Sequence, residues 1–543
     1  MSVLAFLAAA IGGAVIATLL RGFRRLGTLA GLGAVVVTLV AASFVNPEAP
    51  LGIGGGALAG TAHLRLVLIL SLASGLLVLV VARLATWQPS APGALLGGAA
   101  GIALALGLVG TPPGLLAAAA ATIAASTLAL GSLAAPSRIR ALARELRGAA
   151  TSAVIGLVAA GIMPSGASGP AAAGIMPPGA SGPAAVLETG DAVAQPGVAA
   201  LVLLAMALVM AHRFGAIPLH ARVSRLADAA PSGALPILAA WIPAAWGLLI
   251  LGWAPAALVS FSADLGLARG LIVVLAISSL LLGTVAALIQ DEVEHVVAYT
   301  IVSDAGVALL ALSALDPAAS EAARAWVLVF ATTRAAMIGW TIAFRAVFGT
   351  GRLRDTAGWI RRAPALGVAL AGIFVAAVGW PGLLAWDARL AIVQSATSGP
   401  ALLLAYAGSL GTGAALARLL IIGGGRPSAV VAGALGELPR LPARPASVAG
   451  DRPTGNATAT LGGGRTGAAA RMARLANRVR VVAAEIRRDA RPSLELNRVP
   501  LRAFAVILLT GLALLAAVGA FGIDAAARAP VPILPSPAPI VRA

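Results

Sequence analysis

The chain has 543 residues, of which 59% are hydrophobic and only 11% are charged. A soluble domain carries about 25% charged residues, so this composition excludes an ordinary soluble protein. The net charge of +18 would indicate nucleic-acid binding in a soluble protein. Here the basic residues fall between long apolar runs, so we expect the lipid bilayer as the environment and no nucleic-acid partner.

Two residue types are missing from the sequence, and each absence excludes a kind of chemistry. There is no cysteine, so disulfides and thiolate-held iron–sulfur clusters are excluded. The four histidines are scattered along the chain, so we expect no metal site. All 38 basic residues are arginine. Because a guanidinium keeps its proton in proteins, these side chains hold charge without exchanging a proton.

Apolar runs of a length that crosses a bilayer recur along the chain. The runs cover residues 2–20, 27–45, 62–82, 93–110, 113–134, 149–164, 197–217, 234–254, 269–289, 296–315, 323–348, 364–385, 388–424 with a break, and 502–523. We interpret the first run as a retained helix because its arginines follow it. The predicted fold is all-α, a polytopic membrane helix bundle of about fourteen spans with broken helices, packed through small residues.

The charges of the connecting segments predict the topology. Arginines concentrate in alternate connections, beginning with Arg21, Arg24 and Arg25, whereas the other connections carry acidic residues such as Glu48 and Asp264. Cytoplasmic loops hold the positive excess, so both termini are predicted to lie outside.

The predicted domains follow from these runs. Residues 1–424 form the membrane bundle, with its core at about 60–424. An exterior loop at 165–196 contains most of a thirteen-residue duplication, "AGIMPSGASGPAA" followed by "AGIMPPGASGPAA", which starts at residue 160. We interpret the duplication as a neutral insertion.

The last two predicted domains follow the membrane bundle. Residues 425–500 form a basic cytoplasmic loop, in which about 468–489 reads as an amphipathic helix on the inner membrane surface or against a partner subunit. Residues 501–543 hold the last span and an exterior tail.

Three stretches place charges in or beside apolar spans, where charges are costly and suggest function. The first is "MAHRFGAIPLHARVSRLADAAPSGALP", residues 210–236, in which Arg213 precedes a helix-breaking Pro218 and then His220. Such a break exposes backbone dipoles to a polar cavity, as at the ion sites of transporters. The alternative is that Arg213 extends to the membrane interface.

The second stretch is "ALIQDEVEHVVAYTIVSDAG", residues 287–306. Asp291, Glu292, Glu294 and His295 form an acidic group between two spans, and Asp304 lies further into the next helix. A histidine beside carboxylates relays protons near neutral pH, although a solvated turn is the alternative.

The third stretch is "VGWPGLLAWDARLAIVQSA", residues 378–396. Pro381 and Gly382 interrupt a span, and an Asp387–Arg389 pair follows them. The pair is interpreted as part of a polar channel or as an exterior turn with its own ion pair.

These stretches carry motifs in the order found in a known family. The first matches at Arg213, Pro218, His220, Asp228 and Pro231. The later motifs match at Gln290, Glu294, His295, Ala298, Tyr299 and Gly306; at Asp355, Gly358, Arg361, Arg362 and Pro364; and at Gly379, Pro381, Gly382 and Arg389. In this order the motifs resemble the antiporter-like membrane subunits of respiratory complex I, in particular the subunit N type, over about residues 60–424.

The resemblance implies a membrane-arm subunit of a complex-I-like NADH-quinone oxidoreductase in the bacterial inner membrane. It implies a contribution to redox-coupled proton translocation, other membrane-arm subunits as partners, and no redox centre or cofactor on this chain. The implied proton-path or coupling residues are Arg213, Arg389, His220, Asp228, Glu294, His295 and Asp304.

The chain departs from the family's pattern at several charged positions. Arginines replace the family's lysines of the seventh and twelfth spans, and the eighth-span lysine falls near Pro243. The fifth-span glutamate falls near Ala129, with Glu145 further along as a weak substitute. A structural paralogue that does not conduct, a subunit of a multi-subunit cation/proton antiporter, and an unrelated transporter therefore remain as alternatives.

Overall fold

A computed structural model of the chain describes residues 2–46, 51–53, 56–85, 88–108, 110–131, 136–162, 196–379 and 381–428, with Val431 and Gly511. Most of the duplication, the expected amphipathic helix and nearly all of the expected last span lie outside the described residues. The expected span count and the location of the termini therefore stay predictions.

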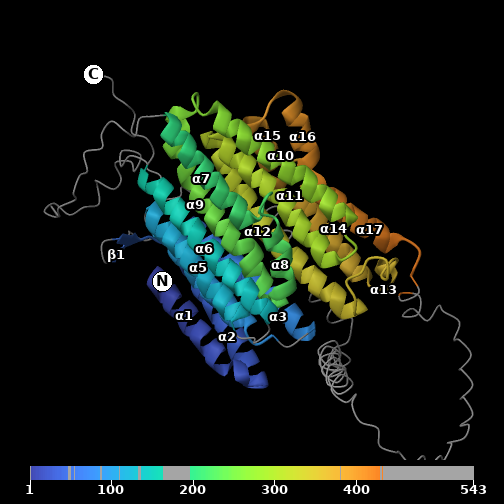
Figure 1. Cartoon of the computed structure of the whole chain (residues 1–543). Coiled ribbons are helices and arrows are strands. Elements are labelled where there is room, and N and C mark those ends of the chain that lie inside the picture. The colour runs from blue at the N-terminus through green and yellow to red at the C-terminus, as the bar shows by residue number, and fades with distance from the viewer. Residues whose placement is uncertain are drawn as a thin grey trace, which may run out of the picture.

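The described part of the chain is a bundle of helices lying side by side (Figure 1), as the sequence predicted. The first third contains α1 (Val3–Leu19), a short 3-10 turn (Leu20–Gly22), α2 (Arg24–Ser43), the strands β1 (Leu51–Ile53) and β2 (Gly56–Leu58), α3 (Ala62–Ala85), α4 (Ala91–Gly107), α5 (Thr111–Leu130) and α6 (Pro136–Ile162). The two strands form a small antiparallel hairpin.

The middle of the chain supplies the most deeply buried helices. It contains α7 (Pro196–Phe214), α8 (Ala221–Ala229), a 3-10 turn (Ser232–Ala234), a π-helical stretch (Pro236–Trp241), α9 (Ile242–Leu258), a 3-10 turn (Val259–Phe261), α10 (Gly266–Ile289), α11 (Val293–Ala314) and α12 (Pro317–Phe348). The spans that include α9, α11 and α12 are 94–100% buried in their most apolar windows, so they form the interior of the bundle.

The last described part of the chain is divided into short helices. It contains α13 (Trp359–Arg362), α14 (Pro364–Val378), α15 (Leu384–Ala396), α16 (Gly399–Ser409) and α17 (Gly411–Gly424). Eleven helical segments of the described residues are long and apolar enough to span a membrane, and α4 and α14 are shorter apolar helices. The protein is therefore a multi-pass membrane protein.

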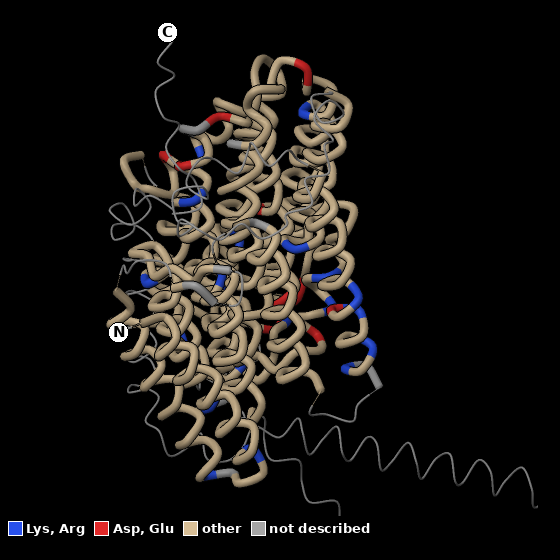
Figure 2. The backbone as a smooth tube through the Cα atoms, turned by 90° about the vertical axis from the view of Figure 1, so that its left-hand side faces the viewer, with Lys and Arg blue, Asp and Glu red and all other residues tan. Residues whose placement is uncertain are grey.

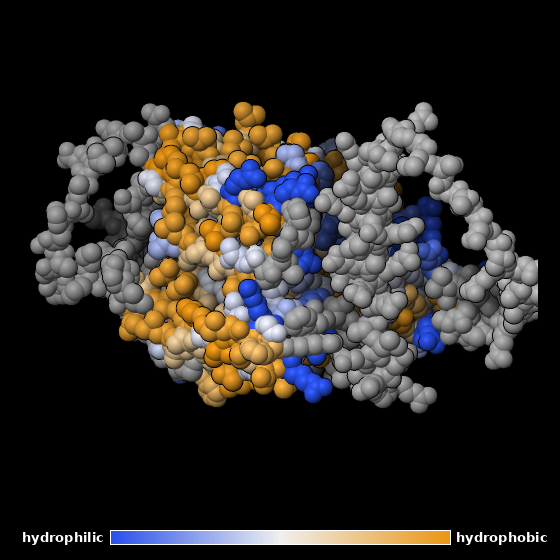
Figure 3. Space-filling model, turned by 60° about the horizontal axis from the view of Figure 1, so that its bottom comes forward, coloured by the Kyte–Doolittle hydropathy of each residue, from blue (hydrophilic) through white to orange (hydrophobic). Residues whose placement is uncertain are grey.

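Charged positions are sparse along the chain (Figure 2), where the acidic ones gather near the top and in the lower middle of the view. Seen from the bottom, the visible surface is largely hydrophobic with separate hydrophilic patches (Figure 3). One exposed apolar stripe follows α10 through Leu267, Val274 and Leu282, at 91%, 60% and 54% exposure. A helix with this outer face suits a hydrocarbon environment.

The two helix breaks predicted at Pro218 and Pro381 are present, and the structure also interrupts the run of residues 388–424. The chain leaves the helix after Phe214 and resumes it at Ala221, around Pro218. The second break lies around Pro381, where α14 ends at Val378 and α15 begins at Leu384. The run of residues 388–424, expected to contain one break, is interrupted twice, between α15 and α16 and between α16 and α17. Proline lacks the backbone N–H that a helix interior requires, which explains the first two breaks.

One boundary expected from the sequence is wrong. The apolar run of residues 149–164 was expected to form the span, with the charged segment before it in a loop. Instead α6 begins at Pro136 and carries Arg138, Glu145 and Arg147 within its first half. Because the segment is helical, Glu145 points into the bundle, where its residue is only 7% exposed.

Close approach of helices depends on glycine at the α10–α11 contact. A Cβ added to Gly283 of α10 would lie 2.6 Å from the backbone nitrogen of Ser303 on α11. A Cβ at Gly306 of α11 would lie 2.5 Å from the carbonyl oxygen of Ala276. Small residues at such contacts let membrane helices pack by direct backbone approach. This contact positions Asp304, which lies between Ser303 and Gly306 in the chain.

We predict that Gly283→Ala destabilises the protein by roughly 1–3 kcal/mol because the added methyl group overpacks against α11. The matched control is Gly270→Ala on the same helix, where a Cβ meets nothing within 4 Å. The midpoint of thermal unfolding of the purified protein in detergent measures both effects. Equal midpoints for the two variants would contradict the packing argument.

Candidate functional site

The break between α7 and α8 holds the first cluster of buried charges, defined here as Glu145, Arg213 and Arg222. Arg222 of α8 donates from Nη2 to Oε2 of Glu145 at 3.0 Å and from Nε at 3.2 Å. Its Nη1 donates to the carbonyl oxygen of Arg213 at 2.7 Å. Arg222 therefore links α6 to the end of α7, and the carbonyl group released by the helix break has a partner.

Arg213 itself is fully buried, with 0% exposure. Its Nε donates to the hydroxyl of Ser152 at 3.0 Å, and its guanidinium lies 5.5 Å from the ring centroid of Trp246. Neither Nη1 nor Nη2 has a hydrogen-bond partner among the described residues. The side chain thus stays inside the bundle, and the interpretation that it extends to the interface is wrong. A Cβ at Gly148 would lie 3.0 Å from Nη2, so a glycine leaves room for this guanidinium.

The second cluster consists of Asp304, Arg334 and Arg389. Asp304 of α11 forms an ion pair with Arg334 of α12, and their side chains are 6% and 0% exposed. Arg389 of α15 interacts electrostatically with both. Its Nη1 donates to the carbonyl of Val378 and its Nη2 to that of Ala377, at the end of α14. A cation at the C-terminus of a helix is stabilised by the exposed carbonyl dipoles.

The expected pair between Asp387 and Arg389 is absent from the ion pairs of the described chain. Arg389 instead uses the carbonyl groups of Ala377 and Val378, which the break between α14 and α15 leaves without helical partners. The sequence showed the break and the arginine but not which acceptor the arginine reaches. The site is therefore a capped helix end rather than a local side-chain pair.

The third cluster lies at the start of α11 and is partly exposed. His295 contacts Asp228 of α8 through Nε2 at 3.3 Å and Glu292 through Nδ1 at 3.7 Å. Glu294 pairs with Arg345 of α12 at 3.0 Å. Asp291 pairs with Arg354, which follows α12 in the chain. The acidic group thus joins α8, α11 and the end of α12. Most of these side chains remain partly exposed, so the alternative of a solvated turn stays open.

The seven residues predicted from the sequence therefore divide among these clusters. Arg213 belongs to the first, Asp304 and Arg389 to the second, and Asp228, Glu294 and His295 to the third. His220, at the start of α8, belongs to none of the clusters as defined, and its Nδ1 has no hydrogen-bond partner among the described residues. The roles of these residues in a proton path stay predictions.

Sequence reasoning missed Arg334 and undervalued Glu145. Arg334 lies in "ATTRAAMIGW", near the middle of an apolar run of about 26 residues. An arginine at that depth is a functional signal by itself, because it must find a buried partner. Glu145 was named only as a weak substitute for the fifth-span glutamate, because the segment that carries it was assigned to a connection. The structure places it in α6, where it pairs with Arg222.

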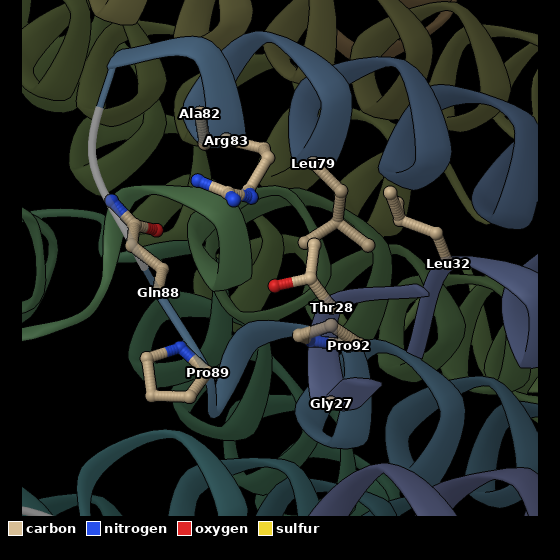
Figure 4. A pocket seen from close by; sticks show the side chains of 9 residues that line it. All are labelled: Gly27, Thr28, Leu32, Leu79, Ala82, Arg83, Gln88, Pro89 and Pro92. Atoms are coloured by element: carbon tan, nitrogen blue, oxygen red, sulfur yellow. The ribbon is translucent and has the colours of Figure 1, made fainter. Parts of the chain in front are cut away.

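A small pocket lies apart from these clusters, where α3 and α4 meet (Figure 4). Arg83, Thr28 and Pro92 are among its lining residues, and Gln88 beside them accepts a bond from the backbone N–H of Gly233 at 2.6 Å. The cavity volume is about 20 Å³, which suits a single water molecule and no substrate. The bond from Gly233 to Gln88 joins the α3–α4 connection to the segment after α8.

The described chain is a bundle of membrane helices with buried charges at its helix breaks. Residues 185–414 match the model of the family described as NADH:quinone oxidoreductase/Mrp antiporter, TM. The first relatives of known name are NADH-quinone oxidoreductase subunits N. That of Thiobacillus denitrificans is 29% identical over 217 residues, which cover 39% of this chain and 43% of the relative. That of Thioalkalivibrio sulfidiphilus is 27% identical over 249 residues, 45% of this chain and 50% of the relative.

Solved structures show the same fold. A chain of respiratory complex I from Thermus thermophilus with bound NADH superposes with a TM-score of 0.60 at 18% identity, over 78% of this chain and 89% of that one. A chain of the Mrp complex from Dietzia sp. DQ12-45-1b gives 0.58 at 19% identity, over 77% and 47%. The resemblance read from the sequence is confirmed: the chain resembles antiporter-like subunits, with subunit N among its relatives. The sequence matches span about half the length of those relatives or less.

We predict that Glu145→Gln destabilises the protein by about 3–5 kcal/mol, because it leaves the buried guanidinium of Arg222 without its counter-ion. The control is Asp291→Asn, which removes an exposed pair with Arg354 and changes stability by about 0–1 kcal/mol. In that pair the side chains are 83% and 43% exposed. Thermal unfolding in detergent compares the two variants. Similar losses would show that Glu145 is hydrated rather than buried.

Proposed function

We propose that this chain is a membrane-arm subunit of a complex-I-like NADH-quinone oxidoreductase, located in a bacterial inner membrane. In this role it contributes to redox-coupled proton translocation beside other membrane-arm subunits. The exposed apolar stripe of α10 and the outer faces of α1 and α2 are the surfaces available to lipid and to those neighbours.

The observation that carries this proposal is the pair of buried clusters at broken helices. Each contains one carboxylate and two guanidiniums: Glu145 with Arg213 and Arg222, and Asp304 with Arg334 and Arg389. Ionisable groups inside a membrane bundle are expensive and mark ion pathways by default. A bundle of apolar helices is stable without buried charges, so two such clusters at helix breaks indicate a function.

The comparisons support the same proposal. The family model covers the segment from α7 to the first residues of α17, which holds five of the six residues of the two buried clusters. The named relatives are subunits of NADH-quinone oxidoreductase. In this proposal the chain carries no flavin, nicotinamide or iron–sulfur centre of its own. The lack of cysteine throughout the sequence supports the absence of an iron–sulfur centre.

A second function is a subunit of a multi-subunit cation/proton antiporter. The similarity to a chain of the Mrp complex favours it, because the fold agrees as well with that chain as with the chain from complex I. A third is a paralogue that seals the membrane arm without conducting. The complete lack of lysine favours it, because arginine does not release a proton.

We predict that the chain, affinity-purified from native membranes in mild detergent, brings down soluble subunits that bear flavin and iron–sulfur clusters. Deleting its gene should lower NADH-driven proton uptake into inverted membrane vesicles. Purification without such subunits, together with unchanged uptake, would refute the oxidoreductase assignment. A sodium-dependent pH change in vesicles of an antiporter-deficient host would then favour the antiporter.

The double variant Arg213→Gln with Arg389→Gln distinguishes a subunit that takes part in proton translocation from one that only seals the membrane arm. If the buried charges act in translocation, we expect proton uptake per NADH oxidised to fall severalfold. The control is Arg361→Gln, at an exposed position of α13 before α14. Equal uptake in the double variant and the parent would favour the sealing role.

A further inference from the structure

The second cluster surrounds one carboxylate with fixed partners. Asp304 is only 4% exposed, and Oδ2 pairs with Nη2 of Arg334. Nη1 of Arg334 donates to the hydroxyl of Thr300 at 2.9 Å, one turn before Asp304 on α11. The guanidinium is therefore held against the face of α11 that carries the carboxylate, and a different angle of approach would cost both bonds.

The other oxygen of Asp304 faces the break between α16 and α17. Thr412 of α17 donates from Oγ1 to Oδ1 of Asp304 at 3.0 Å and accepts from Nη2 of Arg334 at 3.1 Å. A carboxylate opposite the first turn of a helix is stabilised by the free N–H groups there. A Cβ at Gly411 would lie 1.6 Å from Oγ1 of Thr284, so the start of α17 is pressed against α10. Thr412 is fixed in place by this contact.

The remaining charged group of the cluster is Arg389. Its two Nη atoms are occupied by the carbonyl groups at the end of α14, and its Nε has no partner among the described residues. The charges of Asp304, Arg334 and Arg389 sum to one positive charge. Neither arginine releases its proton in a protein. Among the three, the carboxyl group is the one whose protonation can change.

We propose that Asp304 takes up and releases the translocated proton in this half of the bundle, with Arg334 and Thr412 as its positioning residues. The inference rests on the proposed function, and it assigns the exchangeable proton to a carboxylate rather than to a basic side chain. It also explains how an arm subunit without lysine conducts.

The exchange involves no electron transfer. On uptake, a proton forms an O–H bond with Oδ1 of Asp304, and the new hydroxyl donates to Thr412, whose own O–H turns away. The bond between Thr412 and Asp304 reverses without movement of the heavy atoms, because a hydroxyl both donates and accepts. The net charge of the cluster rises by one. On release the proton leaves Oδ1, the hydroxyl of Thr412 turns back, and the ion pair with Arg334 is restored.

The competing explanation is a structural one, in which the ion pair only joins α11 to α12. Single variants do not separate the two, because removal of one partner leaves a buried charge that destabilises the bundle. The double variant Asp304→Asn with Arg334→Gln separates them, since two neutral amides of similar size hydrogen-bond to each other. Replacing both partners of a buried pair is often neutral for stability.

The test measures proton uptake per NADH oxidised in inverted vesicles that contain the assembled complex. We expect the double variant to assemble and oxidise NADH while its uptake falls about tenfold or more, as for loss of a proton-transfer group. Asp304→Glu should recover part of the uptake. Asp264→Asn, which removes an exposed carboxylate outside the clusters, should match the parent.

A spectroscopic readout covers the case in which the double variant fails to assemble. NADH-triggered infrared difference spectra of the parent should contain a carboxylic-acid C=O band that shifts in Asp304→Glu. An unshifted band, or parental uptake in the double variant, would overturn the assignment of Asp304 and leave the proposed function standing. Absence of NADH-driven uptake in the parent itself would instead refute the proposed function.

Discussion

A buried charge in this bundle needs a partner that lipid does not provide, and the breaks in the helices provide part of it, beside the ion pairs of Glu145 with Arg222 and of Asp304 with Arg334. An unbroken helix uses all its backbone groups internally, whereas a broken one leaves carbonyl and N–H groups free at each end. Arg222 takes the freed carbonyl of Arg213, and Arg389 takes those of Ala377 and Val378. The charges and the breaks therefore stabilise one another, and neither would persist alone in the apolar interior.

The sequence predicted most of this scaffold because its signals are local. Long apolar runs identified the helices, and the prolines at 218 and 381 identified two of the breaks, since proline disrupts a helix wherever it falls. A break within residues 388–424 was also expected. The structure interrupts this run twice, between α15 and α16 and between α16 and α17, and the sequence did not locate either interruption.

The site was predicted less completely because partners depend on tertiary structure. Arg213, Arg389 and Asp304 were recognised as charges at membrane depth. The partners of Arg213 and Asp304 include residues 61 and 108 positions away in the sequence, Ser152 and Thr412. The acceptors of Arg389 lie only 11 and 12 positions away, but they are backbone carbonyl groups that the sequence pattern does not reveal. Arg334 was missed although its apolar surroundings were visible in the sequence. Glu145 was misplaced because hydropathy locates the apolar part of a helix, whereas α6 extends 13 residues further toward the N-terminus.

Helix α11 makes polar contacts at two depths, one near the surface of the bundle and one in its interior. His295, near the surface, contacts Asp228 of α8, and Asp304, in the interior, contacts α12 and α17. The two residues are nine positions apart, which is about 14 Å along a helix axis. One continuous helix therefore carries a partly exposed imidazole that contacts α8 and a buried carboxylate that joins α12 and α17.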